Sequence, residues 1–141
     1  MKIFILDDQP GWADTIAWDL EKAGYDAYGY FHAPQAMFDI HRADFLVTDY
    51  HLSGTTGLEI VRRACDQGWR GSAILTTPYP RQVHDQDHPS IRMTLLKPYD
   101  VADLIEAIAL IQADIAISRW RRSTNGLLTP LTSPACGGAT L

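Results

Sequence analysis

Residues 3–8 read Ile-Phe-Ile-Leu-Asp-Asp, a four-residue apolar run that is followed directly by two aspartates. A short uncharged run rich in Ile, Leu and Val is typical of a strand buried on both faces. Three more runs of this kind occur further along the chain, at residues 45–48, 73–76 and 93–96. Together the four runs predict the core of a β-sheet.

The segments around these runs complete a regular alternation of strands and helices. Residues 26–31 are a weaker strand candidate, because aromatic side chains alternate with small ones, as in a strand with one face partly open. Apolar periodicity predicts helices over residues 12–23, 34–41, 58–67 and 101–117. The inward stripe of the last helix is Val101, Leu104, Ile105, Ile108, Ile111 and Ile115. Alternation of this kind implies parallel pairing through right-handed crossovers, and hence a three-layer α/β sheet.

The connection between the last two strands is irregular. Pro78, Pro80 and Pro89 enclose the polar residues 81–88, which have no apolar stripe. We expect a short or irregular helix of one or two turns there, since a helix of that length is marginal. His84 and His88 could bind a transition metal on such a helix, but a solvated loop explains the same composition.

Length and charge limit the possible functions. The 141 residues carry 12 Lys and Arg against 17 Asp and Glu, for a formal net charge of −5. Three of the arginines lie in residues 119–122, so residues 1–118 carry 9 minus 17, or −8. This acidic balance argues against direct nucleic-acid binding. With no leader, no run of membrane-spanning length and no disulfide framework for Cys65 and Cys136, we expect a cytoplasmic protein.

We expect one domain over residues 1–118 and a tail or linker over residues 119–141. The tail begins with Arg119, Arg121 and Arg122 and continues with Ser, Thr, Pro and Gly, which is a disordered composition. The arginines complement the dipole at a helix C-terminus, or they contact an acidic partner or membrane surface. Leu110 and Ile117 lie on a second face of the preceding helix and could form a homodimer surface.

Chemically reactive residues follow the strands of the predicted sheet. In an open α/β sheet, ligands bind beyond the carboxyl ends of the strands. The residues expected at this edge are Asp7, Asp8, Asp49, Thr76, Thr77, Lys97 and Pro98. Each has a simple alternative role, because Asp pairs form turns and helix caps, threonine is common in strands, and Lys-Pro often begins a helix. The conjunction of all of them at successive strand ends indicates a site.

Clustered carboxylates need a positive charge among them, and a hard divalent cation such as Mg²⁺ is the usual partner. We assign Asp8 and Asp49 as direct ligands and Asp7 as a ligand directly or through water. The backbone carbonyl of His51 could add a neutral oxygen. An aspartate beside Mg²⁺, a lysine and a hydroxyl is also the arrangement required to form an aspartyl phosphate. Asp49 is the expected nucleophile, because it stands alone after the central strand.

The ordered set Asp7-Asp8, Asp49, Thr76 and Lys97-Pro98, with residues 52–59 after the central aspartate, resembles the receiver domain of bacterial two-component response regulators. The resemblance is to chemotaxis-regulator-like receivers and covers about residues 2–118. It implies a (βα)5 flavodoxin-like sandwich with a parallel five-stranded sheet of order 2-1-3-4-5.

The resemblance also implies a role for each matching residue. Asp49 would accept a phosphoryl group from a histidine kinase or phosphotransfer protein, with Asp7, Asp8 and the His51 carbonyl holding Mg²⁺. Lys97 and Thr76 would contact the phosphoryl group and switch binding of a downstream protein. The peptide bond before Pro98 is typically cis in the family. The protein would then be a phosphoacceptor switch that assists its own phosphorylation and dephosphorylation, not an enzyme.

The sequence departs from the family pattern at three positions beside the site. Thr94 stands where the family usually has an aromatic switch residue, Thr77 replaces a small residue, and Ser53 replaces a common proline. Thr94 and the irregular connection between Pro78 and Pro89 keep open a degenerate receiver that acts as a phosphorylation-independent interaction module, although all the acceptor residues are present. A Mg²⁺-dependent phosphatase fits less well, because its second acid would lie two residues after the nucleophile, and Asp7 is followed by Asp8-Gln9-Pro10.

Overall fold

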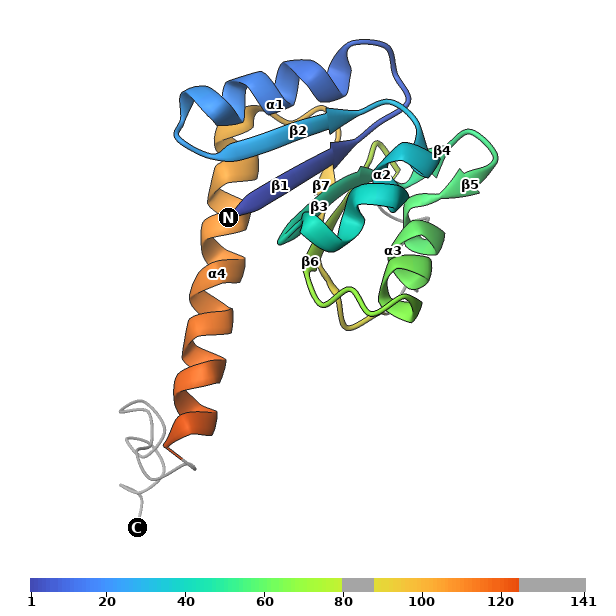
Figure 1. The fold of residues 1–141 in the computed structure, drawn as a ribbon. Coiled ribbons are helices and arrows are strands. Elements are labelled where there is room, and N and C mark those ends of the chain that lie inside the picture. The colour runs from blue at the N-terminus through green and yellow to red at the C-terminus, as the bar shows by residue number, and fades with distance from the viewer. Residues whose placement is uncertain (80–87, 125–141) are drawn as a thin grey trace. The chain divides into compact units, whose positions relative to one another are not determined.

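The computed structural model describes residues 1–79 and 88–124 (Figure 1). Residues Met1–Ile105 form one compact unit, and Glu106–Leu141 belong to a second. The first unit contains a five-stranded parallel sheet in the order β2-β1-β3-β6-β7. Its strands are β1 (Lys2–Leu6), β2 (Asp26–Tyr30), β3 (Phe45–Asp49), β6 (Ser72–Thr77) and β7 (Ile91–Leu96). Since β6 and β7 are the fourth and fifth strands of this sheet, the predicted flavodoxin-like order 2-1-3-4-5 is confirmed.

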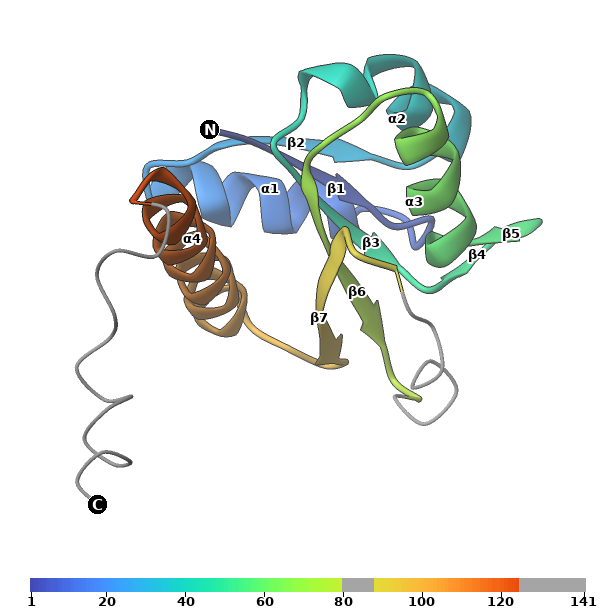
Figure 2. The same cartoon turned by 90° about the horizontal axis from the view of Figure 1, so that it is seen from below.

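Helices cover both faces of the sheet. Figure 2 shows α1 (Trp12–Lys22) on one face and α2 (Ala33–Asp39) and α3 (Gly57–Asp66) on the other. A short 3-10 turn, Ile40–Arg42, follows α2. The predicted three layers are therefore present in the described part of the first unit. The core between the sheet and α2 and α3 includes Phe4, Leu6, Leu46, Ile60, Val61 and Ala64.

The small residues of β2 allow α1 to lie close to the sheet. A Cβ atom at Gly29 would lie 2.8 Å from the carbonyl carbon of Ala13, so only glycine fits there. Ala27 is buried, whereas Tyr28 keeps 39% of its surface exposed. The predicted alternation of small and aromatic residues, with one face partly open, is confirmed.

The end of β3 is packed tightly against the start of α3. A Cβ atom at Gly57 would lie 2.5 Å from the backbone oxygen of Asp49. The preceding residue, Thr56, caps α3, because its hydroxyl oxygen accepts a hydrogen bond from the Glu59 amide at 3.2 Å. This close packing fixes the backbone from which the Asp49 side chain projects.

Two elements differ from the sequence-based expectation. Residues 93–96 were expected to be buried on both faces, but alternate residues of β7 are exposed, and Leu96 is 56% exposed. Because successive side chains of a strand point to opposite faces of the sheet, this pattern means that one face of β7 is open; within the described residues β7 lies at the edge of the sheet beside β6. Residues 51–56, between the predicted strand at 45–48 and the predicted helix at 58–67, contain a small antiparallel hairpin made of β4 (His51–Leu52) and β5 (Thr55–Thr56).

The last helix is longer than its apolar pattern suggested. Helix α4 (Val101–Ser123) continues beyond residue 117, because Arg and Trp tolerate helical conformation and cations favour the C-terminal end of a helix. Leu110 and Ile117 are exposed, as expected for a second face. The expected short helix over residues 81–88 and most of the expected tail fall on residues 80–87 and 125–141, outside the described residues. Among the described residues, no helix combines the length and apolarity required to cross a membrane.

Candidate functional site

Three aspartates meet at the carboxyl edge of the sheet. Asp7 and Asp8 follow β1, and Asp49 ends β3. Each offers a carboxylate oxygen, and these oxygens all lie within 4.8 Å of one another. Because β1 and β3 are hydrogen-bonded neighbours, their carboxyl ends bring together residues that are more than 40 positions apart. The convergence expected from the sequence is therefore present.

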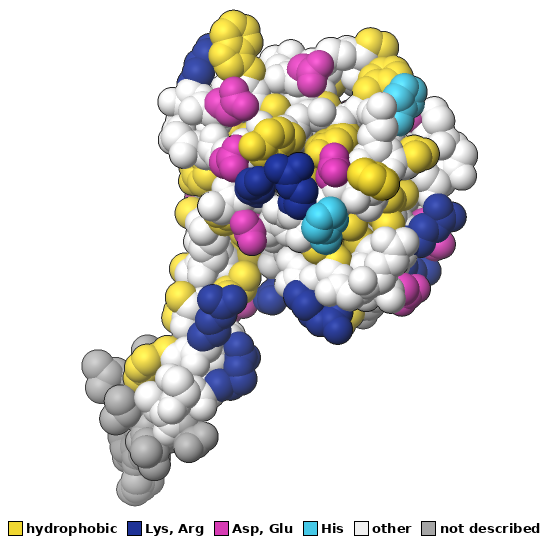
Figure 3. Space-filling view, in the orientation of Figure 1, with side chains coloured by type: hydrophobic (Ala, Val, Ile, Leu, Met, Phe, Trp, Pro, Cys, Tyr) yellow, Lys and Arg dark blue, Asp and Glu magenta, His cyan; other side chains and the backbone are white. Residues whose placement is uncertain are grey.

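Lys97 lies between two of these carboxylates. Its Nζ atom donates a hydrogen bond to Asp7 Oδ2 at 2.7 Å and lies 3.2 Å from Asp49 Oδ2. The Lys97 side chain is only 16% exposed, so water screens these ion pairs weakly. Figure 3 shows Lys and Arg side chains close to Asp and Glu side chains on the face seen there, with hydrophobic side chains between them.

The electrostatics of the site reflect burial and crowding. Burial raises the pKa of the Asp49 carboxyl, and the nearby Asp7 charge adds to this shift, whereas Lys97 opposes it. Burial acts to lower the pKa of the Lys97 ammonium, but the hydrogen bond and charge of Asp7 and the charge of Asp49 outweigh it, so this pKa is raised. The lysine therefore remains a cation, and Asp49 carries a charge that its surroundings disfavour.

Asp8 is anchored to the β4–β5 hairpin. Its Oδ2 atom accepts hydrogen bonds from the Ser53 amide at 2.7 Å and from the Ser53 hydroxyl at 2.9 Å. The hydrogen bond from the backbone amide could not form with a proline at position 53, since proline has no N–H. The serine that stands here in place of the common proline therefore contacts the acidic cluster. This contact was not predicted from the sequence.

The neighbours of Asp49 also include residues predicted from the sequence. Thr76 on β6 is paired with Asp49 in the sheet register and is fully buried. The His51 amide donates to Asp49 Oδ1 at 3.3 Å. Asp7 Oδ1 accepts a hydrogen bond from the Gln9 amide at 2.9 Å, which fixes the turn after β1.

The remaining predicted residues lie further along β6 and β7. Thr77 is buried, and its hydroxyl oxygen accepts a hydrogen bond from the Tyr79 amide at 3.0 Å. Thr94 is exposed on β7, and the peptide bond between Lys97 and Pro98 is cis, as the resemblance implied.

Tyr99 is a residue of this site that the sequence did not single out. Its ring packs edge-on against Trp12 with the centroids 6.0 Å apart, and its side chain is buried. Burial raises the pKa of Tyr99 to about 12, and the charges of Asp7 and Asp49 add to the shift. The aromatic pair therefore lies within the electric field of the acidic cluster. Its position in the sequence, directly after Lys97-Pro98, could have identified Tyr99 as a neighbour of the site.

The charges of the cluster fit a divalent cation. Three carboxylates and one ammonium leave a net charge of −2 in the cluster, which one divalent cation would neutralise. All the ligand atoms offered by Asp7, Asp8 and Asp49 are carboxylate oxygens, which Mg²⁺ prefers over nitrogen or sulfur.

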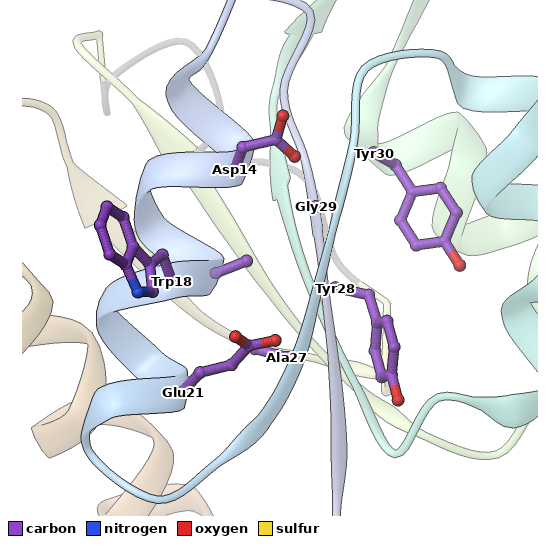
Figure 4. A pocket seen from close by; sticks show the side chains of 8 residues that line it. Asp14, Trp18, Glu21, Ala27, Tyr28, Gly29 and Tyr30 are labelled. Atoms are coloured by element: carbon purple, nitrogen blue, oxygen red, sulfur yellow. The ribbon is translucent and has the colours of Figure 1, made fainter.

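A separate recess lies beside the edge of the sheet formed by β2. It lies between α1 and β2 and is lined by Asp14, Trp18, Glu21 and Tyr28, among others (Figure 4). None of the predicted site residues contributes to it. Of the alternative metal site at His84 and His88, His84 lies outside the described residues. His88 Nδ1 accepts a hydrogen bond from the Ser90 amide at 3.1 Å.

The fold and the acidic site define a doubly wound α/β protein with a strand-end carboxylate cluster. No protein-family model matches the chain, and no curated protein matches its sequence. Solved structures do match. A CheY-like response regulator receiver domain from Methanospirillum hungatei has a TM-score of 0.68 at 21% identity, covering 80% of this chain and 94% of the other. A CheY-like receiver domain from Methylobacillus flagellatus gives 0.70 at 20% identity, covering 79% and 98%.

A third similar structure is the response regulator TrrA from Thermotoga maritima in complex with Mg²⁺ and BeF. Its TM-score is 0.67 at 20% identity, and the match covers 77% of this chain and 96% of the other. The chain described here therefore has the fold of CheY-like response regulator receiver domains.

Proposed function

We propose that this chain is a phosphoacceptor receiver of a two-component signal transduction system, in which Asp49 accepts a phosphoryl group. The observation that carries the proposal is the convergence of Asp7, Asp8 and Asp49 with Lys97 between two of them. Similar folds support it, including the TrrA complex with Mg²⁺ and BeF and a BeF3-activated receiver domain of DrrB.

Mg²⁺ is the proposed cofactor, and Asp7, Asp8, Asp49 and the backbone carbonyl of His51 would hold it. When bound, it would supply positive charge to the oxygens of the phosphoryl group. Asp7 and Asp8 stand as a pair after β1 and would serve only as Mg²⁺ ligands. Asp49 stands alone at the end of the central strand β3, and its carboxylate would also be the nucleophile.

Asp49, Lys97 and Thr76 would carry out the transfer. An oxygen of the Asp49 carboxylate forms a bond to phosphorus, and the P–N bond of a phosphohistidine donor breaks, with the electron pair remaining on the imidazole nitrogen. Lys97 already contacts Asp49 Oδ2 at 3.2 Å, so its ammonium is close enough to stabilise the added negative charge. Thr76, next to Asp49 in the sheet, would provide the switch hydroxyl.

The proposal includes the partners and the output. A histidine kinase or phosphotransfer protein would donate the phosphoryl group, and a downstream protein would bind the phosphorylated form. The chain itself would act as a switch and not as an enzyme. A cytoplasmic location remains a prediction.

Tryptophan fluorescence tests the proposal, because Trp12 packs against Tyr99 beside the acidic cluster. Mg²⁺ is titrated with and without beryllofluoride into the wild type, Asp49→Asn and Trp12→Phe. We expect a saturable Mg²⁺ response and a further beryllofluoride response in the wild type. The beryllofluoride response should disappear in Asp49→Asn, and Trp12→Phe identifies the indole that reports it.

A second measurement uses mass spectrometry after incubation with phosphoramidate. We expect one phosphoryl group on the wild type and none on Asp49→Asn. A phosphoryl group retained by Asp49→Asn contradicts the assignment of the acceptor. If neither Mg²⁺ nor beryllofluoride affects the wild type, the chain is instead a degenerate receiver that binds partners without phosphorylation, a reading that the exposed Thr94 on β7 favours.

A further inference from the structure

We propose that Ser53 is a positioning residue for Asp8, which prepares the carboxylate cluster to bind a divalent cation. This inference rests on the proposed function and adds to it a residue outside the predicted ligand set. It begins from the two hydrogen bonds that Ser53 donates to one oxygen of Asp8, at 2.7 Å from the amide and 2.9 Å from the hydroxyl.

The hairpin fixes the position of Ser53. The pairs His51–Thr56 and Leu52–Thr55 leave Ser53 and Gly54 as a two-residue turn. Gly54 has a φ of 76°, in the left-handed region that glycine adopts without strain. A tight turn of this kind restricts the directions of the Ser53 amide and hydroxyl, so the hairpin presents two donors in a fixed arrangement.

In the part of the chain that the structure describes, Asp8 has fewer other hydrogen-bond partners than Asp7 and Asp49, so its position depends on Ser53. Asp7 and Asp49 are largely buried and are held by Lys97 and by backbone amides. Asp8 is half-buried, and within residues 1–79 and 88–124 its side-chain hydrogen bonds all come from Ser53. Without Ser53, the Asp8 side chain would sample several rotamers and would lose that freedom on binding a cation.

The geometry also leaves Asp8 able to bind. Both Ser53 donors contact Oδ2, and among the described residues no hydrogen bond reaches Oδ1. A carboxylate offers about four lone-pair positions, so Oδ1 and part of Oδ2 remain available to a cation. Two charge-assisted hydrogen bonds also reduce the repulsion between Asp8 and the other two aspartates. Ser53 therefore supports a cation at this carboxylate and does not compete with it.

The test begins in the metal-free protein with amide hydrogen exchange measured by NMR. Asp8→Ala should accelerate exchange of the Ser53 amide by about tenfold, because its acceptor is removed, while amides in β1 and β3 change little. An unchanged Ser53 exchange rate would overturn the inference, since it would mean that Asp8 does not engage the hairpin.

The second arm measures Mg²⁺ affinity from amide shifts in the intact chain. Because partners that orient metal ligands are typically worth about 10–100-fold in affinity and Asp8 is half-buried, we expect Ser53→Ala to weaken binding by about 3–10-fold. Ser53→Thr keeps both donors and should bind within about twofold of the wild type. Thr55→Val is the matched control, because the Thr55 hydroxyl in the same hairpin has no hydrogen-bond partner among the described residues.

The outcomes separate this inference from the proposed function. A wild type that binds no Mg²⁺ overturns the proposed function and the role of Ser53 together. A wild type that binds Mg²⁺ while Ser53→Ala binds equally well, or more tightly, overturns the positioning role alone. An equal loss in Thr55→Val also overturns it, since hairpin stability would then be the cause.

Discussion

The Nζ atom of Lys97 lies 2.7 Å from Asp7 Oδ2, closer than its 3.2 Å distance to Asp49 Oδ2. The lysine therefore pairs most closely with Asp7, which follows β1 and lies 90 positions away in the sequence. A cation bound among the carboxylates would share Asp7 and Asp49 with this ammonium. Metal binding at this cluster would therefore be coupled by charge to the position of Lys97.

Replacement of Lys97 by Met should destabilise the metal-free protein. It leaves Asp7 and Asp49 without their ammonium partner, and removing one member of a buried pair costs about 3–5 kcal/mol. Because Lys97 is 16% exposed, we expect about 2 kcal/mol, measured by urea unfolding. Arg63→Ala, which breaks an exposed pair with Glu59, is the control and should have little effect. Mg²⁺ should stabilise Lys97→Met more than the wild type.

Asp49→Asn should raise the melting temperature of the metal-free protein by a few degrees. The folded-state pKa of Asp49 is raised above its unfolded value, so the stability linked to its proton is present at acidic pH and is lost as pH rises through the folded pKa. At neutral pH the ionised carboxylate therefore costs stability, which the neutral amide avoids. Thermal unfolding at pH 7 in the presence of a chelator measures this difference. A lower melting temperature in the variant would contradict it.

Two glycines provide a paired test of how the fold supports the site. A Cβ atom would collide with backbone atoms at both Gly57 and Gly29, so each Gly→Ala variant should lose roughly 2 kcal/mol or more. Of the two added Cβ atoms, only the one at position 57 would collide with Asp49, at the backbone oxygen of Asp49. We therefore expect weaker Mg²⁺ binding in Gly57→Ala and unchanged binding in Gly29→Ala, measured by Mg²⁺ titration. Equal effects on binding would mean that general destabilisation is responsible.

Alkaline pH should reveal the burial of Tyr99. Its pKa is raised to about 12 from 10.0, so its contribution to stability is present below pH 10 and is lost as pH rises toward 12. A shift of this size corresponds to about 2–3 kcal/mol. The free energy of unfolding should fall less between pH 10 and pH 12 in Tyr99→Phe than in the wild type. Ultraviolet titration of tyrosinate provides the independent measurement, with one late-titrating group missing in the variant.

Local patterns were sufficient to predict much of the fold. Apolar runs such as residues 3–6 and 45–48 identified the central strands, because burial on both faces requires an uninterrupted apolar stretch. The edge strand β7 was misjudged, since its sequence resembles that of a central strand and its exposure depends on what lies beside it. The β4–β5 hairpin was also missed, because two-residue strands have no periodicity to detect.

The order of residues along the chain was enough to predict which chemical groups stand at the strand ends. Asp7, Asp8, Asp49 and Lys97 could be assigned to one edge, because parallel strands all end on the same side. How these groups pair with one another became visible in the folded chain. The hydrogen bonds from Ser53 to Asp8 and from Lys97 to Asp7 join residues 45 and 90 positions apart. Contacts at such separations depend on how the hairpin and sheet pack, which residue spacing along the chain does not encode.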